Sequence, residues 1–259
     1  MFYALATRKL RPRALRFKHV LEDIEKLNQQ ALEGAFEVTA ISVGAYPYLA
    51  ARYRLLSTGA SIADGYGPLV VASHLFPPEE LKQKKVAVPG KLTTAYLLLK
   101  LFEPDVETVV VPFDRILETV QERAADAGLL IHEGQLTYDR MGLHRIVDLG
   151  RWWQQQERLP LPLGAVAVRR DLPPELQLEV SKLLRRSIEY AMEHREEAMS
   201  YALHFARDLD PALADKFVGM YVNEYTLDCG PRGREAIARL LELGYQRGAI
   251  PVQVEAEFV

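Results

Sequence analysis

His132 is the residue whose position best suits acid–base chemistry. It ends the apolar run 127–132 (AGLLIH), and polar or small residues follow in Glu133-Gly134-Gln135. Histidine titrates near neutral pH, so it can accept a proton and return it. Glu133 could orient the imidazole, although neighbours on an extended strand point to opposite faces. From the residues alone, His132 is either a general base or the last residue of a strand that runs out into a polar loop.

Polar side chains also follow three other predicted strands. Ser42 ends VTAIS, Thr93 and Thr94 follow VAVPGKL, and Asp114 ends VVVPFD. In open α/β sheets, ligands bind beyond the carboxyl ends of the strands. The threonine pair would open a helix, whose free N–H groups and partial positive charge attract a carboxylate or a phosphate. Each of these side chains could instead be a helix cap, and Asp114 fits that simpler role best.

Other kinds of catalytic or metal site lack their motifs. No serine lies in a G-x-S-x-G sequence, and Ile-His-Glu-Gly-Gln lacks the second histidine of a zinc-binding H-E-x-x-H motif. Cys229 is the one cysteine of the 259 residues, which argues against a disulfide framework and a cysteine-ligated metal. We therefore predict no metal site.

Charge and hydropathy exclude further classes of partner. The formal net charge is −3, which gives no electrostatic case for nucleic acid. No apolar run approaches the roughly 20 residues that span a bilayer. The first ten residues, MFYALATRKL, place their charges after the apolar part, which is the reverse of a secretory signal. We therefore expect a cytoplasmic protein with no membrane partner.

Strands and helices are predicted to alternate through the first two thirds of the chain. The predicted strands cover residues 14–20, 36–42, 68–72, 85–88, 108–112, 127–132 and 164–169. Predicted helices cover residues 2–9, 24–32, 45–56, 93–102, 116–124 and 151–158, and four more follow at 175–194, 196–208, 211–224 and 232–247. This alternation is typical of an α/β protein with a parallel sheet.

The spacing of the strands predicts two lobes. The short apolar strands 68–72 and 164–169 lie on either side of a βαβαβ block that begins near residue 85. We interpret this block as an inserted domain, so that residues 1–72 and 170–259 form a larger lobe and residues 73–169 a smaller one. A cleft between the lobes is then the expected ligand site.

Longer motifs carry a resemblance to a known family. They are VAVPGKLTTAYLLLKLF, FDRILETVQERAADAGLLIHEGQLTYDRMGL, LPLPLGAVAVRRDL and YVNEYTLDCGPRG, with LEDIEKLNQQALEG and VTAISVGAYPYL nearer the start. The chain resembles the 1,4-dihydroxy-6-naphthoate synthases of the futalosine route to menaquinone. The resemblance covers nearly the whole chain, and GLLIHEGQLTY is its most specific part.

The resemblance implies a fold, an activity and a set of site residues. The fold would be two-lobed, like the type II periplasmic binding proteins, in a cytoplasmic lyase. The reaction would convert cyclic dehypoxanthine futalosine, an aromatic carboxylate, to 1,4-dihydroxy-6-naphthoate by carbon–carbon cleavage without a cofactor or a metal. By resemblance, His132 is the proton acceptor, and the substrate-binding residues are Ala40, Ile41, Ser42, Thr93 and Thr94.

The resemblance has one departure and two alternatives. Members of the family begin with a strand and a loop of the S-P-C-P-N-D-T-F type, whereas this sequence starts at the helix that follows them. We expect that the initiation codon is misplaced. A larger lobe that lacked the strand would expose the edges of its two neighbouring strands.

Two alternative functions stay open. Chorismate dehydratase shares the architecture, but the IHEGQLTY motif argues against it. A solute-binding protein without catalysis is the second alternative.

Overall fold

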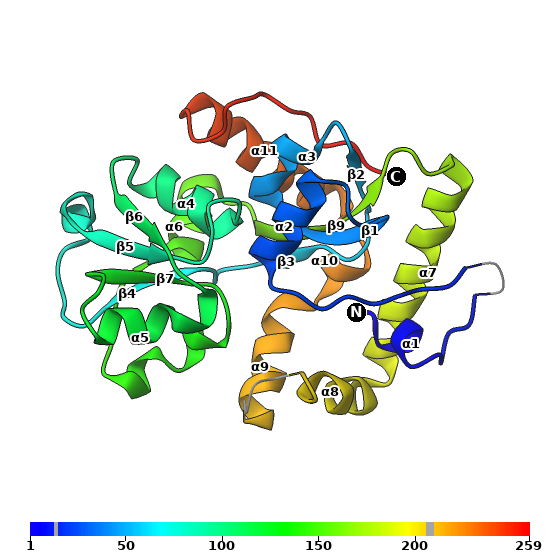
Figure 1. The fold of residues 1–259 in the computed structure, drawn as a ribbon, viewed down its shortest axis with the longest axis horizontal. Helices are drawn as coiled ribbons and strands as arrows, with labels where there is room; N and C mark the ends of the chain where they lie inside the picture. The colour runs from blue at the N-terminus through cyan, green and yellow to red at the C-terminus, as the bar shows by residue number, and fades with distance from the viewer. Residues whose placement is uncertain (13–14, 206–209) are drawn as a thin grey trace.

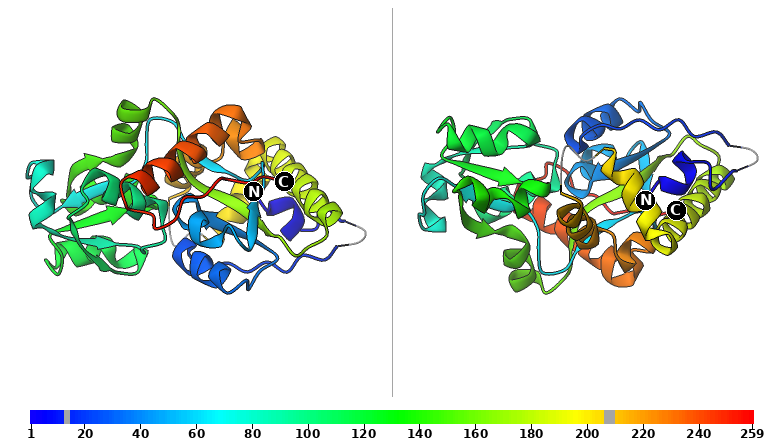
Figure 2. Two further views of the ribbon diagram at one scale, coloured as in Figure 1. Left: turned by 90° about the horizontal axis from the view of Figure 1, so that it is seen from above. Right: turned by 90° about the horizontal axis from the view of Figure 1, so that it is seen from below.

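The computed structural model describes residues 1–12, 15–205 and 210–259, and it contains two lobes, each built on its own β-sheet (Figure 1). The larger lobe holds a four-stranded sheet and the smaller lobe a five-stranded sheet. Both chain termini lie in the larger lobe, as the views from above and below show (Figure 2). The predicted two-lobed α/β architecture is confirmed.

Among the named strands of the described residues, parallel pairing occurs in one part of the smaller lobe. Its strand order is β6-β5-β7-β4-β8. The strands are β4 (Leu69–Ala72), β5 (Lys85–Val88), β6 (Glu107–Val110), β7 (Ala127–Leu130) and β8 (His144–Asp148). β5 runs parallel to β6 and to β7, whereas β4 is antiparallel to β7 and to β8. The helices of this lobe are α4 (Thr94–Phe102), α5 (Ile116–Gln121) and α6 (Leu149–Glu157).

The sheet of the larger lobe is antiparallel, so the parallel sheet predicted from the alternation is wrong there. The strand β9 (Leu161–Arg169) pairs antiparallel with β1 (Val38–Ser42), β2 (Tyr53–Leu55) and β3 (Ser61–Ala63). The chain passes through β1, β2 and β3 before it enters the smaller lobe, and β9 brings it back in the opposite direction. Periodicity along a sequence carries no information on which strands pair or in which direction.

Helices cover the larger lobe. They are α1 (Tyr3–Ala6), α2 (Ile24–Leu32), α3 (Tyr46–Leu49), α7 (Pro174–Glu193), α8 (Arg195–Leu203), α9 (Pro211–Tyr221), α10 (Glu224–Leu227) and α11 (Gly230–Gln246). Asp23 caps α2 by accepting a hydrogen bond from the Lys26 N–H, as predicted. The last residues of the predicted helix 196–208, from 206 to 208, lie outside the described residues.

Two predicted elements are wrong. In one a strand pairing replaces the predicted helix, and in the other the pairing that a strand needs is missing. The predicted helix 45–56 shrinks to α3, and the chain then enters β2, where Tyr53 and Leu55 are completely buried beside β9. Burial in the sheet overrides the local helical pattern. The predicted strand 14–20 forms no strand within residues 15–20, because no neighbouring strand exchanges hydrogen bonds with it.

The sheets divide the chain a few residues away from the predicted boundaries. β4 pairs with β7 and β8 and so belongs to the smaller lobe, while β9 belongs to the larger one. We therefore place the two crossings before Leu69 and before Leu161, rather than after residues 72 and 169. Both strands are short and apolar, so their composition suits either sheet.

The first crossing packs directly on the start of α6. A Cβ atom on Gly150 would collide with the backbone of Tyr66 and Gly67, and the Leu149 N–H donates to the Pro68 carbonyl at 3.0 Å. The two backbones can therefore approach this closely only because position 150 has no side chain.

Gly150→Ala is expected to destabilise the protein by about 1–3 kcal/mol, because the added methyl group forces the crossing away from α6. In an unobstructed helix the same change stabilises by about 1 kcal/mol. Gly219→Ala in α9 is the matched control, since its Cβ would meet only an Arg195 nitrogen at 3.8 Å. Urea unfolding of both variants measures the difference, and a Gly150→Ala protein as stable as the wild type would contradict this account.

Candidate active site

The ends of three parallel strands bring His132 close to the start of α4. β6, β5 and β7 are neighbours that run in one direction, so the segments that follow them leave the same edge of the sheet. Phe113 follows β6, Thr93 and Thr94 follow β5, and His132 follows β7. The rings of Phe113 and His132 lie 4.2 Å apart between centroids, across the end of β5. The segments that follow these three strands are therefore gathered at one edge of the sheet.

Phe113 sets the position of the imidazole. Its ring is tilted by 56° against the His132 ring. The backbone of His132 is extended, and its carbonyl accepts the Gln135 N–H at 2.9 Å at the start of the short 3-10 helix η4 (Glu133–Leu136). An aromatic contact on one side and a fixed backbone turn limit the rotamers that the histidine can adopt.

The Thr93 hydroxyl is used within the protein. Its oxygen accepts the Tyr96 N–H at 3.1 Å and its hydrogen is donated to the Gly90 carbonyl at 2.8 Å. The residue is only 2% exposed. The helix-cap alternative is therefore right for this side chain, and Thr93 has no hydroxyl donor left for a ligand.

The Thr94 hydroxyl joins the two lobes. It accepts the Gly44 N–H at 3.0 Å, just beyond β1, and donates to the Leu163 carbonyl of β9 at 2.6 Å. Thr94 is also 2% exposed. Within the described residues, the backbone N–H groups of Thr94 and Ala95 make no hydrogen bond, so the start of α4 keeps donors for an anion.

Ser42 is held by a buried asparagine. Asn28 of α2 accepts the Ser42 N–H at 2.8 Å and donates to the Ser42 hydroxyl oxygen at 3.0 Å. Ser42 does not cap the 3-10 helix η1 (Val43–Ala45) that follows it. Its hydroxyl hydrogen remains available as a donor, beside the Gly44–Thr94 contact. Ala40 and Ile41 precede it in β1, and Ile41 is completely buried.

Asp114 does not cap a helix as predicted. It lies inside the 3-10 helix η3 (Phe113–Arg115), and no side chain caps α5. The helix begins at Ile116 as predicted, but a 3-10 turn precedes it, so that Arg115 rather than Asp114 occupies the cap position.

Glu25 places a carboxylate from the larger lobe at the loop before α4. Its Oε2 accepts the Leu92 N–H at 3.1 Å, and its side chain fills the space over Gly90, where a Cβ atom would collide with it. Burial raises the pKa of Glu25, although hydrogen bonds from Gln29 and Leu92 oppose this. A charged Glu25 would repel an anionic ligand at this loop, whereas a protonated Glu25 would not.

A further contact between the lobes involves the turn that follows His132. The Tyr221 hydroxyl at the end of α9 donates to the Gln135 Oε1 at 3.0 Å. Gln135 is buried and also donates to the Leu130 carbonyl at 3.3 Å. Burial raises the pKa of Tyr221 far above its ordinary value, so the phenol stays protonated and remains a donor. This bond ties the turn that carries His132 to the larger lobe.

Sequence reasoning missed Asn28, Glu25, Gln135 and Tyr221. For Asn28 a signal exists, since an amide on the inner face of a predicted amphipathic helix needs a partner. Glu25 lies three residues before Asn28 and so shares its face. Gln135 and Tyr221 are 86 residues apart in the chain, and nothing local links them.

Comparisons with known proteins identify the family. The family described as Menaquinone biosynthesis matches residues 1–246. The 1,4-dihydroxy-6-naphthoate synthase of Thermus thermophilus is 43% identical over 96% of this chain and 90% of its own length. The enzyme of that name from Streptomyces coelicolor is 37% identical over 88% of this chain and 83% of its own.

The chain belongs to the menaquinone biosynthesis family. A crystal structure of a protein from Archaeoglobus fulgidus superposes on this family member with a TM-score of 0.92, at 48% identity and over 96% of this chain and 93% of that one. The alkanesulfonate-binding protein of Xanthomonas axonopodis pv. citri superposes with a TM-score of 0.70, at 13% identity and over 98% and 90% of the two chains. That second likeness establishes the periplasmic-binding-protein fold for this family member and nothing further.

Residues 1–12, 15–205 and 210–259 contain no cluster of three or more His, Cys, Asp or Glu side chains placed to hold a metal ion. Over the same ranges, every helix is too short or too polar to cross a membrane.

Thr94→Ala is expected to lower the free energy of unfolding by about 1–3 kcal/mol, because it leaves the buried Gly44 N–H and the half-buried Leu163 carbonyl without their partner. Thr94→Ser keeps the hydroxyl and is the matched control. Urea unfolding measures both, and equal midpoints for the alanine and serine variants would show that the hydroxyl is not what joins these segments.

Glu25→Gln should gain stability relative to the wild type as pH rises from about 4 to about 7. Burial holds the pKa of Glu25 above its unfolded value. The group therefore favours the folded state below the unfolded pKa, and this contribution is lost as pH rises through the folded pKa. Glu33→Gln, at the exposed end of α2, supplies the background trend in the same unfolding series. A constant difference across this range would contradict the burial argument.

Proposed function

We propose that this protein is a lyase that converts cyclic dehypoxanthine futalosine to 1,4-dihydroxy-6-naphthoate, with His132 as the general base. The observation that carries the proposal is the placement of His132 and the start of α4 at the same edge of one sheet. A base and an anion-binding helix start side by side suit a substrate that carries a carboxylate and loses a proton.

The start of α4 would hold the substrate carboxylate through backbone groups. The hydroxyls of Thr93 and Thr94 are engaged within the protein, so the N–H groups of Thr94 and Ala95 are the available donors. A helix N-terminus of this kind stabilises an anion through its N–H groups and its dipole. Ser42, next to the Gly44–Thr94 contact, would donate its hydroxyl to another oxygen of the substrate.

His132 would take a proton from the substrate and so start the cleavage of the carbon–carbon bond. A histidine is suited to this step because its ordinary pKa lies close to neutral pH. The contact with Phe113 supports the role, since a base must be held in one orientation to reach the proton it removes. The products are the naphthoate and a sugar-derived fragment.

The contacts between the lobes would exclude water from the base. Thr94 binds both Gly44 and Leu163 of the larger lobe, and Gln135 binds Tyr221. These bonds connect the larger lobe to the segments that follow β5 and β7, which carry the proposed site. Excluding water in this way strengthens the electrostatic interactions around a base and suppresses side reactions.

His132→Ala is expected to lower kcat by about 10²–10⁴-fold, the range for the loss of a general base. The measurement is the formation of 1,4-dihydroxy-6-naphthoate from saturating cyclic dehypoxanthine futalosine. Gln135→Ala is a second variant, which removes the Tyr221 contact and leaves the histidine in place, and its smaller loss would separate closure from proton transfer.

His144→Ala is the matched control, because His144 is an exposed histidine at the start of β8. It should turn over the substrate at the wild-type rate. Normal turnover by the folded His132→Ala protein would overturn the assignment of the base. If the wild-type protein bound the substrate without forming product, the solute-binding alternative would replace the proposed activity.

A further inference from the structure

Gln135 holds the three residues that leave β7 and end at His132. Its backbone N–H donates to the His132 carbonyl at 2.9 Å, and its side-chain amide donates to the Leu130 carbonyl at 3.3 Å. One residue thus holds both ends of the segment 130–132. Gln135 is 6% exposed, so its bonds are shielded from water. A movement of the Gln135 side chain would therefore move this segment and turn the imidazole that it carries.

The orientation of the Gln135 amide is set from the larger lobe. The Tyr221 hydroxyl donates to its Oε1 at 3.0 Å, which directs the amide nitrogen at the Leu130 carbonyl. With the amide reversed, its oxygen would face that carbonyl, and two acceptors cannot form a hydrogen bond. The phenol therefore selects the amide orientation that holds the segment 130–132.

The Tyr221 side chain is itself held in one position. Its ring packs edge-on against Tyr66 of the first crossing, with 5.7 Å between ring centroids and an angle of 81°. On another side the Phe217 ring lies 4.9 Å away. The Tyr221 carbonyl accepts the Thr226 hydroxyl at 3.2 Å, which fixes the end of α9. Aromatic contacts of this kind restrict a ring to one orientation, so the hydroxyl reaches Gln135 from a fixed point.

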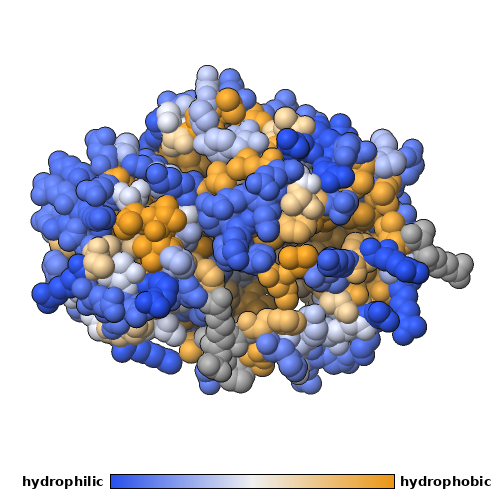
Figure 3. All heavy atoms as spheres, in the orientation of Figure 1, coloured by the Kyte–Doolittle hydropathy of each residue, from blue (hydrophilic) through white to orange (hydrophobic). Residues whose placement is uncertain are grey.

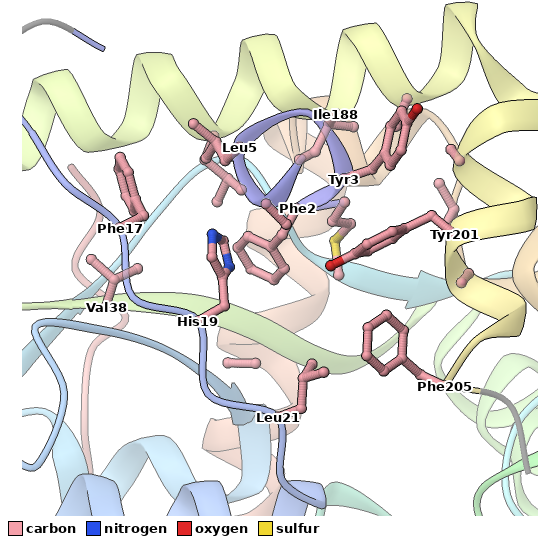
Figure 4. A pocket seen from close by; sticks show the side chains of 18 of the residues that line it. Phe2, Tyr3, Leu5, Phe17, His19, Leu21, Val38, Ile188, Tyr201 and Phe205 are labelled. Atoms are coloured by element: carbon pink, nitrogen blue, oxygen red, sulfur yellow. The ribbon is translucent and has the colours of Figure 1, made fainter. Parts of the chain in front are cut away.

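Other residues near the end of α9 face a different environment. Val218 and Val222 line an apolar hollow of about 490 Å³, together with residues of α1, α7 and α8 (Figure 4). Figure 3 shows apolar surface in the hollowed part of this face of the larger lobe. Tyr221 is not among the lining residues. Removing its hydroxyl therefore leaves the apolar packing of the helix in place.

We propose that Tyr221 is a positioning residue for the base: its hydroxyl orients the Gln135 side chain, which holds the segment that presents His132. This inference rests on the proposed function, because His132 is the base assigned there. Tyr221 belongs to the larger lobe and His132 to the smaller one. This support for the imidazole therefore exists only while the two lobes are in contact, which couples the contact to the orientation of the base.

Tyr221→Phe is expected to lower kcat by about 10-fold to 10²-fold with little change in KM, because a displaced base reaches its proton less often in a productive geometry. Gln135→Ala should lower kcat at least as much, since it removes both side-chain bonds. The double variant should be no slower than Gln135→Ala alone, because Tyr221 acts through Gln135. A further loss of about tenfold in the double variant would overturn the proposal and give Tyr221 a contact of its own with the substrate.

Tyr53→Phe is the matched control for the loss of a phenol hydroxyl. The Tyr53 hydroxyl donates to the Phe36 carbonyl at 2.7 Å within the larger lobe, so this variant loses the same kind of hydrogen bond. Its kcat should equal that of the wild type, and urea unfolding compares the stabilities of the two variants. An equal loss of kcat in both would overturn the proposal, because the loss would then follow from stability alone.

A measurement without substrate separates this inference from the lyase activity. The Phe113 ring lies 4.2 Å from the His132 ring, so its ring current shifts the imidazole NMR signals and makes them sensitive to the orientation of the histidine. The full chain is labelled at histidine, and His132→Ala identifies the signal among those of the six histidines. Tyr221→Phe should move the His132 signal further than Tyr53→Phe does.

The outcomes for the two proposals are distinguishable. An unmoved signal would overturn the positioning role even where the wild-type protein forms the naphthoate. A moved signal would support it even where the wild-type protein forms no product, and the lyase proposal alone would then fail. If Tyr221→Phe does not fold, Tyr221→Phe combined with Gln135→Leu takes its place, because two apolar side chains leave no polar group of this pair without a partner. That variant should move the same signal.

Discussion

The hydroxyl of Thr94 joins the two lobes through two hydrogen bonds at the start of α4. It uses both its acceptor and its donor function, on the Gly44 N–H and the Leu163 carbonyl. One side chain at the start of a smaller-lobe helix thereby holds the end of β1 and the middle of the larger-lobe sheet. Because Thr94 and Gly44 are buried and Leu163 is half-buried, breaking the contact leaves polar atoms without partners, which costs more than the bonds themselves contribute.

The candidate site residues of the smaller lobe follow strands that run parallel. β6, β5 and β7 end at one edge, and the segments that follow them carry Phe113, the threonine pair and His132. The rest of both sheets is antiparallel and serves to position this edge. Glu25 and Tyr221 reach it from the larger lobe, so that lobe contributes a carboxyl group and a phenol hydroxyl to the segments at this edge.

Where local pattern and tertiary environment agreed, prediction from the sequence succeeded. The helices α2 and α4 have caps at Asp23 and Thr93 and apolar faces at helical spacing, and both formed as expected. Residues 45–56 have a helical pattern too, but β9 draws Tyr53 and Leu55 into a strand. Residues 15–20 have a strand pattern, but no strand of the structure pairs with them, and they form no strand.

The sequence by itself determined the two-lobed α/β class, the family and the residues that follow the strand ends, because these depend on composition and on local order along the chain. Only the tertiary structure decided which hydroxyls are engaged, which strands pair and in which direction. It also decided that Asn28, Glu25, Gln135 and Tyr221 meet the predicted residues. The physical reason is that hydrogen bonds between distant segments depend on their positions in space, and periodicity along one segment contains no information about another.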